Sequence, residues 1–503
     1  MNFNPRNNGV QNTFLFHDFE TGGLSTSYDR PMQFAAIRTD QDLNPIGDPI
    51  NIHCKVSDDY LPSPEACVIT GISPYECEEK GLSEADFSKA ILKELGKPGT
   101  CGVGYNSLKY DDNVTRNLLF RTMEDPYRRE WANNNSRWDI LPLIRAVFAF
   151  CPSVMKFPTD ETGKVNFRLE NLAEVNGLIK TRAHDALSDV ETTIALARLI
   201  KEKVPKLFDY YYSLRIKKTV QNKFDMINHS PVLYVTSMAG VEKGLVSPIM
   251  PVVAHPEMFN VFLCIDLSKD LGELLNIPAS DLAHRMYPKD GEERIPVFKV
   301  FSNQSPFIAS PAQLKALEVE RTGLDFDREL ANHNYKLVKA NLALLKPKLQ
   351  QIASLEPKFP LAKDAEGRLF EGFASDSERA RMTQLTRLNP DEMLSALEQE
   401  PFDSSTYNDL MFRYVAKNWP EALNEQQLSQ WHEFVKDRLL TGGPAQLRTF
   451  EDFFKRIEEL KVDAKEDQLA ILVDLEKWGV EKKMHWFPSP ELTQAPKKPV
   501  YKP

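Results

Sequence analysis

The chain has 503 residues, of which 42% are hydrophobic and 27% are charged, and its formal net charge is −10. This length is too great for one ordinary hydrophobic core and predicts several domains. The mildly acidic balance argues against bulk nonspecific affinity for nucleic acid but allows a local basic channel.

Three features of the sequence indicate where the protein is located: its apolar runs, its first residues and its cysteines. No apolar run approaches the length of a membrane span, so we expect no contact with a membrane. Residues 1–12 lack the apolar core of a signal peptide, and we expect them to form a disordered leader. The six cysteines include no C-x-x-C pair, so neither a zinc site nor a disulfide framework is predicted. Reduced thiols in a cytoplasmic protein are the simplest interpretation.

The first two hundred residues alternate between apolar strands and amphipathic helices. Strands are predicted at 13–20, 32–38 and 50–55. Helices are predicted at 84–96, 111–120, 168–178 and 186–203. Strands followed by helices in this order predict an α/β domain with a mixed sheet over residues 13–200.

After Pro205 the pattern changes twice. Short segments rich in Val, Ile and Phe predict a small β barrel or sandwich with helical inserts near 270–288; they lie at 231–237, 247–254, 259–266 and 295–308. From about Ala312 to Trp478 the apolar residues fall at helical intervals, interrupted by a loop-like insert at 359–373. We therefore expect a β-rich domain over 201–358, a helical domain over 359–488, and a disordered Pro- and Lys-rich tail over 489–503.

The apolar stretch from Thr13 to Thr21 ends in two carboxylates, Asp18 and Glu20. Residues i and i+2 of a strand point to the same face, so these two side chains project side by side. Adjacent carboxylates repel each other and lose hydration, and a divalent cation that prefers oxygen ligands, magnesium or manganese, is the usual remedy. Taken alone the pair is weak evidence, because Asp-x-Glu recurs by chance in an acidic chain.

A second acidic pair, Asp111 and Asp112, follows an apolar strand end at 101–105 and opens a predicted helix. For either residue alone, a helix-start charge that complements the helix dipole is the simpler interpretation.

A third stretch, A-H-D-A-L-S-D-V, opens the helix predicted at 186–203. Asp185 is well placed as the helix N-cap. That leaves His184 just outside the helix and Asp189 in its first turns, facing the same opening. A lone histidine is more often structural. A histidine just before the N-terminus of a helix, followed by an aspartate, is a candidate catalytic group.

Together these stretches supply four acids and a histidine in a fixed order: Asp18, Glu20, Asp111, His184 and Asp189. This set resembles the DEDD exonuclease superfamily, in its histidine-bearing branch with an RNase H-like fold, over about residues 13–200. Several strings are similar to the bacterial exonuclease I family, whose members degrade single-stranded DNA from the 3′ end: F-L-F-H-D-F-E-T, D-R-P-M-Q-F-A-A-I-R-T-D, D-D-Y-L-P-S-P, V-I-T-G-I, N-S-R-W-D, F-R-L-E-N-L and A-H-D-A-L-S-D-V. The resemblance implies an RNase H-like exonuclease domain, then an SH3-like β domain, then an all-helical C-terminal domain.

The resemblance also implies a two-metal mechanism. Asp18, Glu20, Asp111 and Asp189 would hold two magnesium ions, with manganese as an alternative, and Asp18 would bridge both ions. His184 would act as general base on the attacking water, because imidazole titrates near the working pH. Attack at the last phosphodiester would release a 5′-mononucleotide, and Glu20 could also contact the terminal sugar.

Further substrate contacts are implied by the resemblance, each with a structural alternative. The segment 68–72, with Ile69 and Thr70, resembles the one that packs against the terminal nucleotide. Arg168 matches a substrate-contacting arginine, or is an exposed residue of an amphipathic helix. Positions that line the DNA path, where stacking faces and cations serve a single strand, are matched by Arg116, Tyr127, Trp131 and Arg145. Ordinary surface or core roles are the alternative for these four.

One further stretch can be interpreted from its residue types alone, without reference to a family. Basic and aromatic residues interleave after residue 200, with Lys201, Lys203, Lys206, Arg215, Lys217, Lys218 and Lys223 among Phe208, Tyr210, Tyr211 and Tyr212. Such a mixture suits a single strand or an acidic peptide, and a solvated charged helix is the plain alternative. The resemblance implies that the acidic C-terminal tail of single-stranded DNA-binding protein docks near the junction of the first two domains. We take the cluster as a hypothesis for part of that site.

The sequence therefore favours a magnesium-dependent 3′→5′ exonuclease of single-stranded DNA, acting as a monomer in DNA repair and recombination. Two alternatives stay open: an RNA-trimming relative that uses the same five residues, and a noncatalytic single-strand-binding scaffold that keeps the fold. The two extra domains argue against the first, since RNA-trimming relatives are generally short single domains. Retention of all four acids argues against the second.

Overall fold

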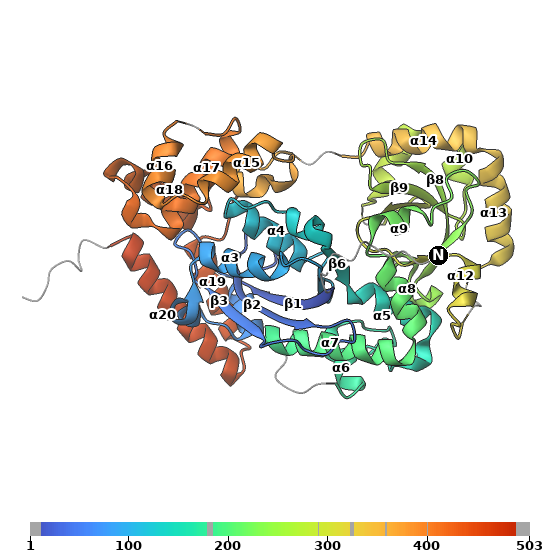
Figure 1. The fold of residues 1–503 in the computed structure, drawn as a ribbon, viewed down its shortest axis with the longest axis horizontal. Helices are drawn as coiled ribbons and strands as arrows, with labels where there is room; N and C mark the ends of the chain where they lie inside the picture. The colour runs from blue at the N-terminus through green and yellow to red at the C-terminus, as the bar shows by residue number, and fades with distance from the viewer. Residues whose placement is uncertain are drawn as a thin grey trace, which may run out of the picture.

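The computed structural model describes residues 12–178, 185–289, 291–321, 326–357, 360–399 and 401–488. They form three units: a central α/β unit, a β-rich middle unit on one side of it, and a helical C-terminal unit on the other (Figure 1). The predicted leader and tail lie outside the described residues, apart from Asn12. The predicted fold class, an α/β domain followed by a β-rich and an all-helical domain, is confirmed.

A six-stranded mixed sheet organises the N-terminal unit, in the order β4-β3-β2-β1-β5-β6. Its strands are β1 (Thr13–Thr21), β2 (Pro31–Thr39), β3 (Ile50–Cys54), β4 (Gly81–Leu82), β5 (Thr100–Gly104) and β6 (Ser136–Asp139). Its helices are α1 (Pro64–Thr70), α2 (Pro74–Lys80), α3 (Glu84–Leu95), α4 (Asp111–Arg121), α5 (Ile140–Phe150), α6 (Leu169–Val175) and α7 (Ala186–Lys203). The central strand β1 pairs antiparallel with β2 and parallel with β5.

Alternation along β1 sends its side chains into two separate cores. Phe14 and Phe16 belong to the core that α7 covers, whereas Leu15 and Phe19 belong to the core under α3 and α4. The two acids of β1 continue the first alternation and therefore face α7.

The middle unit is built on a five-stranded sheet in the order β10-β9-β8-β7-β11, in which every neighbouring pair is antiparallel. Its strands are β7 (Val232–Val235), β8 (Val246–Ala254), β9 (Val261–Asp266), β10 (Val297–Phe301) and β11 (Ile308–Ala309). Its helices are α8 (Pro205–Ser213), α9 (Lys217–Gln221), α10 (Gly272–Asn276), α11 (Ala279–Leu282), α12 (Pro311–Ala316), α13 (Arg328–Ala340) and α14 (Leu342–Ser354). Val338 of α13 and Leu349 of α14 pack with Met250 of β8, and Ile249 joins Trp138 of β6 in a core shared with the N-terminal unit.

The C-terminal unit is helical and also shares its core with the N-terminal unit. Its helices are α15 (Asp376–Leu385), α16 (Pro390–Leu397), α17 (Ser405–Asn418), α18 (Glu425–Thr441), α19 (Phe450–Lys461) and α20 (Glu466–Trp486). Phe453 of α19 and Trp478 of α20 pack in one cluster with Cys67 of α1 and Cys77 of α2. Both flanking units are therefore docked on the central sheet through buried apolar surface, which no local sequence pattern indicates.

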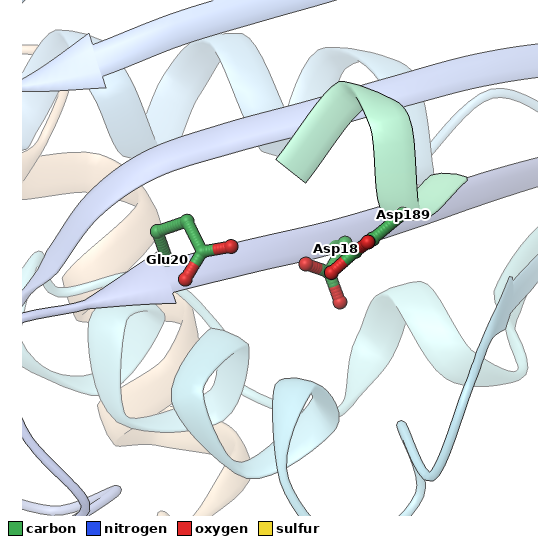
Figure 2. A group of neighbouring side chains, drawn as sticks. All are labelled: Asp18, Glu20 and Asp189. Atoms are coloured by element: carbon green, nitrogen blue, oxygen red, sulfur yellow. The ribbon is translucent and has the colours of Figure 1, made fainter. Parts of the chain in front are cut away.

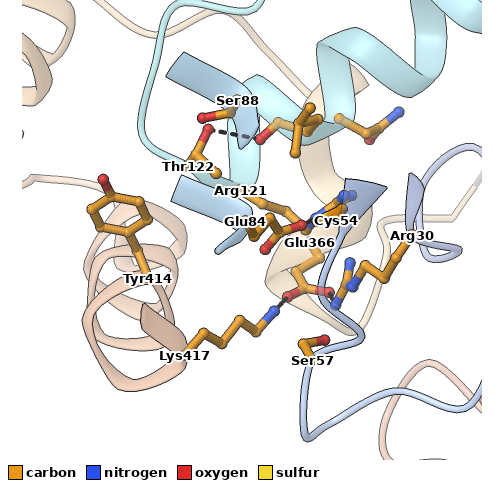
Figure 3. Close-up of polar contacts among 12 residues, drawn as sticks. Arg30, Cys54, Ser57, Glu84, Ser88, Arg121, Thr122, Glu366, Tyr414 and Lys417 are labelled. Carbon is orange, nitrogen blue, oxygen red and sulfur yellow. Dashed lines mark hydrogen bonds and ion pairs between the residues drawn. The ribbon is translucent and has the colours of Figure 1, made fainter. Parts of the chain in front are cut away.

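A buried ion cluster adds a polar link between the central sheet and the C-terminal unit. We call it the anchor cluster, and its members are Arg30, Asp59, Asp364, Glu366, Lys417 and Arg438. Arg30 and Lys417 contact the two oxygens of the Glu366 carboxylate at 2.7 and 2.8 Å (Figure 3). Because Glu366 belongs to the segment that leads into the C-terminal unit, the cluster fixes that segment against the N-terminal unit.

Most predicted elements are confirmed, and the differences have physical causes. The predicted strand 295–308 is two strands, β10 and β11, separated by a turn in which Ser305 has a φ of +46°. The predicted loop 359–373 is wrong in part, since it contains a 3₁₀ helix (Ala365–Phe370) and contributes to the anchor cluster. Helix α5 was not predicted, although its buried residues fall at helical spacing, because its sequence I-L-P-L-I-R-A-V-F-A-F is a short, mostly apolar run with a proline.

Within the part of the chain that the structure describes, no helix combines the length and the apolarity that a membrane span requires. All six cysteines are buried, unpaired thiols.

Candidate metal centre

Two of the candidate carboxylates lie at the end of β1. Asp18 is opposite Ala35 and Glu20 is opposite Gln33 in the β1/β2 ladder, so both side chains point to the face that α7 covers. The pairing shifts register directly after Glu20, where the strand bends away. Figure 2 shows the two side chains projecting from this strand, as its alternation predicts.

The third carboxylate comes from α7. Asp185 caps this helix as predicted, since its side chain accepts the N–H of Ser188 at 3.3 Å. Asp189 lies in the first turns that follow and points toward the strand (Figure 2). Carboxylate oxygens of Asp18, Glu20 and Asp189 lie within 4.8 Å of one another. Residues far apart in the sequence are thus brought into one acidic group.

The two aspartates at the start of α4 have different partners. Asp111 accepts the N–H of Phe19, the residue between the two β1 acids, at 3.2 Å. Asp112 accepts hydrogen bonds from Arg129 at 2.6 Å and from Arg137 at 2.9 Å. Burial alone would raise the pKa of Asp112, but Arg137 and Arg129 hold it below its usual range. Asp111 therefore lies beside the acidic group. Asp112 forms buried ion pairs with Arg129 and Arg137, two arginines for which the sequence predicts no role.

Burial and the repulsion between neighbouring carboxylates raise the pKa values of Asp18, Glu20 and Asp111. Burial, followed by the charges of Asp111, Glu20 and Asp189, raises the pKa of Asp18 well above its usual range. Burial and the charge of Asp189 raise the pKa of Glu20 to about 8. Burial and the neighbouring Asp112 raise the pKa of Asp111 to about 8, although its backbone hydrogen bonds oppose the shift. A site that disfavours its own negative charge in this way is suited to a cation.

The residues present fit a divalent metal ion. The donors are carboxylate oxygens, which suit the hard cations magnesium and manganese. Such an ion would offset the repulsion between the carboxylates and bring their pKa values down again. Asp18, Glu20 and Asp189 are the residues that would hold it, with Asp111 adjacent through the Phe19 peptide.

The predicted general base, His184, lies outside the described residues, so its role stays a prediction. The described chain resumes at Asp185, the next residue, whose capping role for α7 is clear.

An open cleft begins a few residues beyond Glu20. It is lined from the N-terminal unit by Gly23, Leu24 and Ile69 and from the C-terminal unit by Arg448 and Lys455. Ile69 is 58% exposed near the end of α1, and Thr70 is the last residue of that helix. Within the segment predicted to contact the terminal nucleotide, Ile69 is therefore accessible and borders this cleft.

The other predicted DNA contacts fall into two groups. Trp131, 68% exposed, and Arg168, directly before α6, are accessible at the surface. Arg116, in contrast, bonds both oxygens of the Glu130 carboxylate at 2.7 and 3.0 Å and lies 5.3 Å from the ring centre of Tyr127. Most of the capacity of this guanidinium is thus taken up within the protein.

The two remaining candidates are partly buried in the protein. The Tyr127 ring lies 5.3 Å from that of Phe373, an exposed residue of the segment leading into the C-terminal unit. Arg145 of α5 is half-buried, and burial lowers the pKa of its guanidinium. The ring contact indicates a structural role for Tyr127, and the predicted DNA contacts of both residues stay predictions.

The fold divides the basic and aromatic cluster after residue 200. Phe208 and Tyr211 are buried in the core shared by the first two units, so ordinary packing accounts for both rings. The guanidinium of Arg215 lies 3.5 Å from the ring centre of Tyr212. Lys217 and Lys218 are exposed on α9 and stay candidates for an acidic partner.

Family profiles cover most of the chain in three consecutive matches. A profile described as Exonuclease matches residues 15–197, one described as Exonuclease I SH3-like domain matches 215–354, and one described as Exonuclease I C-terminal domain matches 363–482. The curated Exodeoxyribonuclease I of Escherichia coli (strain K12) is 36% identical over 475 residues, which cover 94% of this chain and 98% of that protein.

Solved structures give the same result. The zinc-bound complex of E. coli exonuclease I with single-stranded DNA has a TM-score of 0.84 at 32% identity and covers 94% of this chain and 100% of its own. A complex of exonuclease I with the SSB C-terminal peptide has a TM-score of 0.83 at 32% identity, with the same coverage. The identity and the coverage extend over all three units in the same order. The chain therefore belongs to the exonuclease I family.

Proposed function

We propose that the protein is a magnesium-dependent 3′→5′ exonuclease that degrades single-stranded DNA to 5′-mononucleotides. The observation that carries this proposal is the convergence of the Asp18, Glu20 and Asp189 carboxylates within 4.8 Å of one another. These are the positions at which the family resemblance implies metal ligands. The substrate is supported by a relative whose structure is a complex with single-stranded DNA.

The acidic residues prepare the site by binding and orientation. Asp18, Glu20 and Asp189 would hold divalent ions together with Asp111, whose carboxylate is tethered to β1 by the Phe19 N–H. When bound, two magnesium ions would stabilise the charge that develops on the attacking and leaving oxygens of the phosphodiester. Because several of these carboxylates have raised pKa values, ion binding would displace protons from them.

His184 would remove a proton from the attacking water as a neutral imidazole. In the sequence it directly precedes Asp185, the cap of the helix that carries Asp189. One short segment would thus supply both a metal ligand and the base.

The remaining predicted residues would hold the strand. Ile69 and Thr70 would contact the terminal nucleotide and Glu20 its sugar, while Trp131 would stack on a base and Arg168 would bind phosphate. The exposure of Ile69, Trp131 and Arg168 supports these assignments. The other proposed contacts along the path are Arg116, Tyr127 and Arg145.

We further propose a cytoplasmic monomer that acts in DNA repair and recombination and binds the acidic tail of single-stranded DNA-binding protein. The complex of a relative with the SSB C-terminal peptide supports this partner. We propose domain boundaries at 13–200, 201–358 and 359–488, with residues 1–12 and 489–503 outside the folded domains.

The test is an incubation of the purified protein with 3′- and 5′-labelled single-stranded DNA, its duplex and matched RNA, with magnesium and with EDTA. We expect magnesium-dependent release of mononucleotides from the 3′ end of the single-stranded DNA, and none from Asp18→Ala. Preference for RNA would move the protein to the RNA-trimming relatives. Binding of the strand without cleavage of any substrate would favour a noncatalytic scaffold protein and would overturn the proposed nuclease activity.

A further inference from the structure

Gln33 is a buried polar residue beside the acidic group. The chemistry proposed above gives Gln33 no role. It lies on β2 directly opposite Glu20, so its side chain points to the same face of the sheet as the carboxylates. Only 4% of the residue is exposed. An amide at such a position is expected only where its hydrogen bonds provide something that an apolar side chain could not.

Both N–H groups of this amide are engaged. Nε2 donates to Oδ1 of Asn51 on β3 at 2.9 Å and to Oδ1 of Asp185 at 3.2 Å. Two acceptors on different elements fix the plane of the amide and aim one N–H at Asp185. The amide oxygen is buried and has no hydrogen-bond partner among the described residues. Among the described residues, the hydrogen bonds of this side chain are therefore the two that reach other elements.

Asp185 carries this contact into α7. Its second carboxylate oxygen accepts the N–H of Ser188 at 3.3 Å, and its backbone carbonyl accepts the N–H of Asp189 at 3.1 Å. Gln33 thus holds the cap of the same helical turn that bears the metal-centre residue Asp189. Displacement of this turn by about an ångström would move one carboxylate away from the other two, and metal and catalytic sites are sensitive to displacements of that size.

Apolar packing and the Gln33 hydrogen bond act on α7 in different ways. Val190, Ile194 and Ala197 hold α7 against the sheet, in the core that also contains Ala35 of β2. Apolar burial is nondirectional, whereas a hydrogen bond fixes the direction between its donor and its acceptor. The hydrogen bond from Gln33 therefore adds a directional contact at the first turn of α7.

We propose that Gln33 is a positioning residue for the metal centre, which fixes the first turn of α7 and thereby the place of the Asp189 carboxylate relative to Asp18 and Glu20. This inference rests on the proposed function, because it requires these carboxylates to bind a divalent ion. Gln33 itself needs to touch neither the ion nor the DNA.

Manganese binding to the metal-free protein, measured by titration calorimetry, tests the inference without relying on nuclease activity. Gln33→Met keeps the length of the side chain and removes both donors, and we expect manganese to bind about tenfold more weakly. Binding of a labelled single strand in EDTA is expected to be unchanged. The matched control is Gln41→Met, an exposed glutamine just beyond β2, which is expected to stay within about twofold of the wild type.

Exchanging the chemical groups of Gln33 and Asp185 distinguishes the loss of this hydrogen bond from a loss of packing at position 33. Gln33→Glu places a second carboxylate against Asp185, and at about pH 8.5 it is expected to weaken manganese binding more than Gln33→Met does. Adding Asp185→Asn restores the hydrogen bond in the reverse direction, with the new asparagine amide donating to the new glutamate carboxylate. Asparagine caps a helix as well as aspartate does. We expect the double variant to recover binding to within about threefold of the wild type.

Wild-type manganese affinity in Gln33→Met, or a double variant no better than Gln33→Glu, would overturn the inference. Circular dichroism checks the fold of each protein. If Gln33→Met does not fold, the comparison of Gln33→Glu with the double variant tests the inference. A wild-type protein that neither binds manganese nor cleaves DNA would overturn the proposed function instead, so the two failures are distinguishable.

Discussion

Arg30 and Glu366 form a buried ion pair, with 2.7 Å between Nη2 and Oε2 and at most 3% of either side chain exposed. Arg30 directly precedes β2, the strand that pairs with the acidic end of β1, and Glu366 lies in the 3₁₀ helix that leads into the C-terminal unit. The pair, which Figure 3 shows, therefore links the strand beside the candidate metal centre to the C-terminal unit. That unit contributes Arg448 and Lys455 to the adjacent cleft.

We predict that Glu366→Gln strongly destabilises this link. The substitution leaves Arg30, Lys417 and Arg438 buried with one fewer negative charge, and removing one partner of a buried pair typically costs about 3–5 kcal/mol. The free energy of unfolding in urea measures the loss. The matched control, Glu421→Gln at an exposed position, is expected to change it by less than about 0.5 kcal/mol. Equal stability of the two variants would mean that apolar packing alone docks the C-terminal unit.

The metal-free protein should become less stable as the pH rises. The folded pKa values of Glu20 and Asp111 are raised to about 8, from ordinary values of 4.5 and 3.8. Between the ordinary and the raised values the folded state binds more protons than the unfolded state, so the free energy of unfolding falls with increasing pH across that window. Calorimetric melting in EDTA at a series of pH values measures this slope, and saturating magnesium should remove most of it. A melting temperature that rises with pH in EDTA over this window would contradict the assigned shifts.

Neutralising one acid of the group should stabilise the metal-free protein. Asp18→Asn removes the carboxylate that is repelled by Asp111, Glu20 and Asp189, and we expect a gain of about 1 kcal/mol. For a chain of this length, this gain corresponds to a rise in melting temperature of about 1 °C, measured in EDTA. Magnesium should raise the melting temperature of the wild type and not that of the variant. A lower melting temperature for Asp18→Asn in EDTA would show that the carboxylate is stabilised by contacts other than metal.

Asp111 and Asp112 are neighbours in the sequence for which we predict opposite outcomes. Asp111→Asn should abolish magnesium-dependent cleavage and keep the stability of the metal-free protein, because it lessens repulsion. Asp112→Asn should lower stability by about 3–5 kcal/mol, because Arg129 and Arg137 lose their buried counter-charge. Urea unfolding and a cleavage assay on the two variants provide the comparison. The same phenotype in both would contradict the separate roles assigned to them.

Local patterns are sufficient to predict the parts of the site that lie on regular elements. The alternation of β1 predicts that Asp18 and Glu20 share a face, and the capping signal at Asp185 predicts the start of α7. No spacing rule connects Asp189 to the two strand residues, because more than 160 residues separate them in the chain. The family resemblance alone predicts that these three carboxylates meet.

Features that depend on long-range pairing cannot be predicted in this way. Nothing around Asp112 marks Arg129 and Arg137 as its partners, since the pairing is made by the fold and not by a helical or strand period. The anchor cluster likewise has no local signal, so the segment around Glu366 is predicted to be a loop. Phe208 and Tyr211 are predicted within a cluster of basic and aromatic residues that suits a single strand or an acidic peptide. Their burial against the neighbouring unit depends on how the domains dock, which no local pattern indicates.

We propose that the grouped carboxylates hold the divalent ions that drive release of nucleotides from a 3′ end. The most direct test is the single-turnover rate of mononucleotide release from 3′-labelled single-stranded DNA as a function of magnesium concentration, for the wild type and for Asp189→Asn. We predict a saturable magnesium dependence for the wild type. For Asp189→Asn we predict no release at any magnesium concentration, with unchanged binding of the strand in EDTA. Release by the wild type in EDTA, or release by Asp189→Asn at the wild-type rate, would contradict the claim.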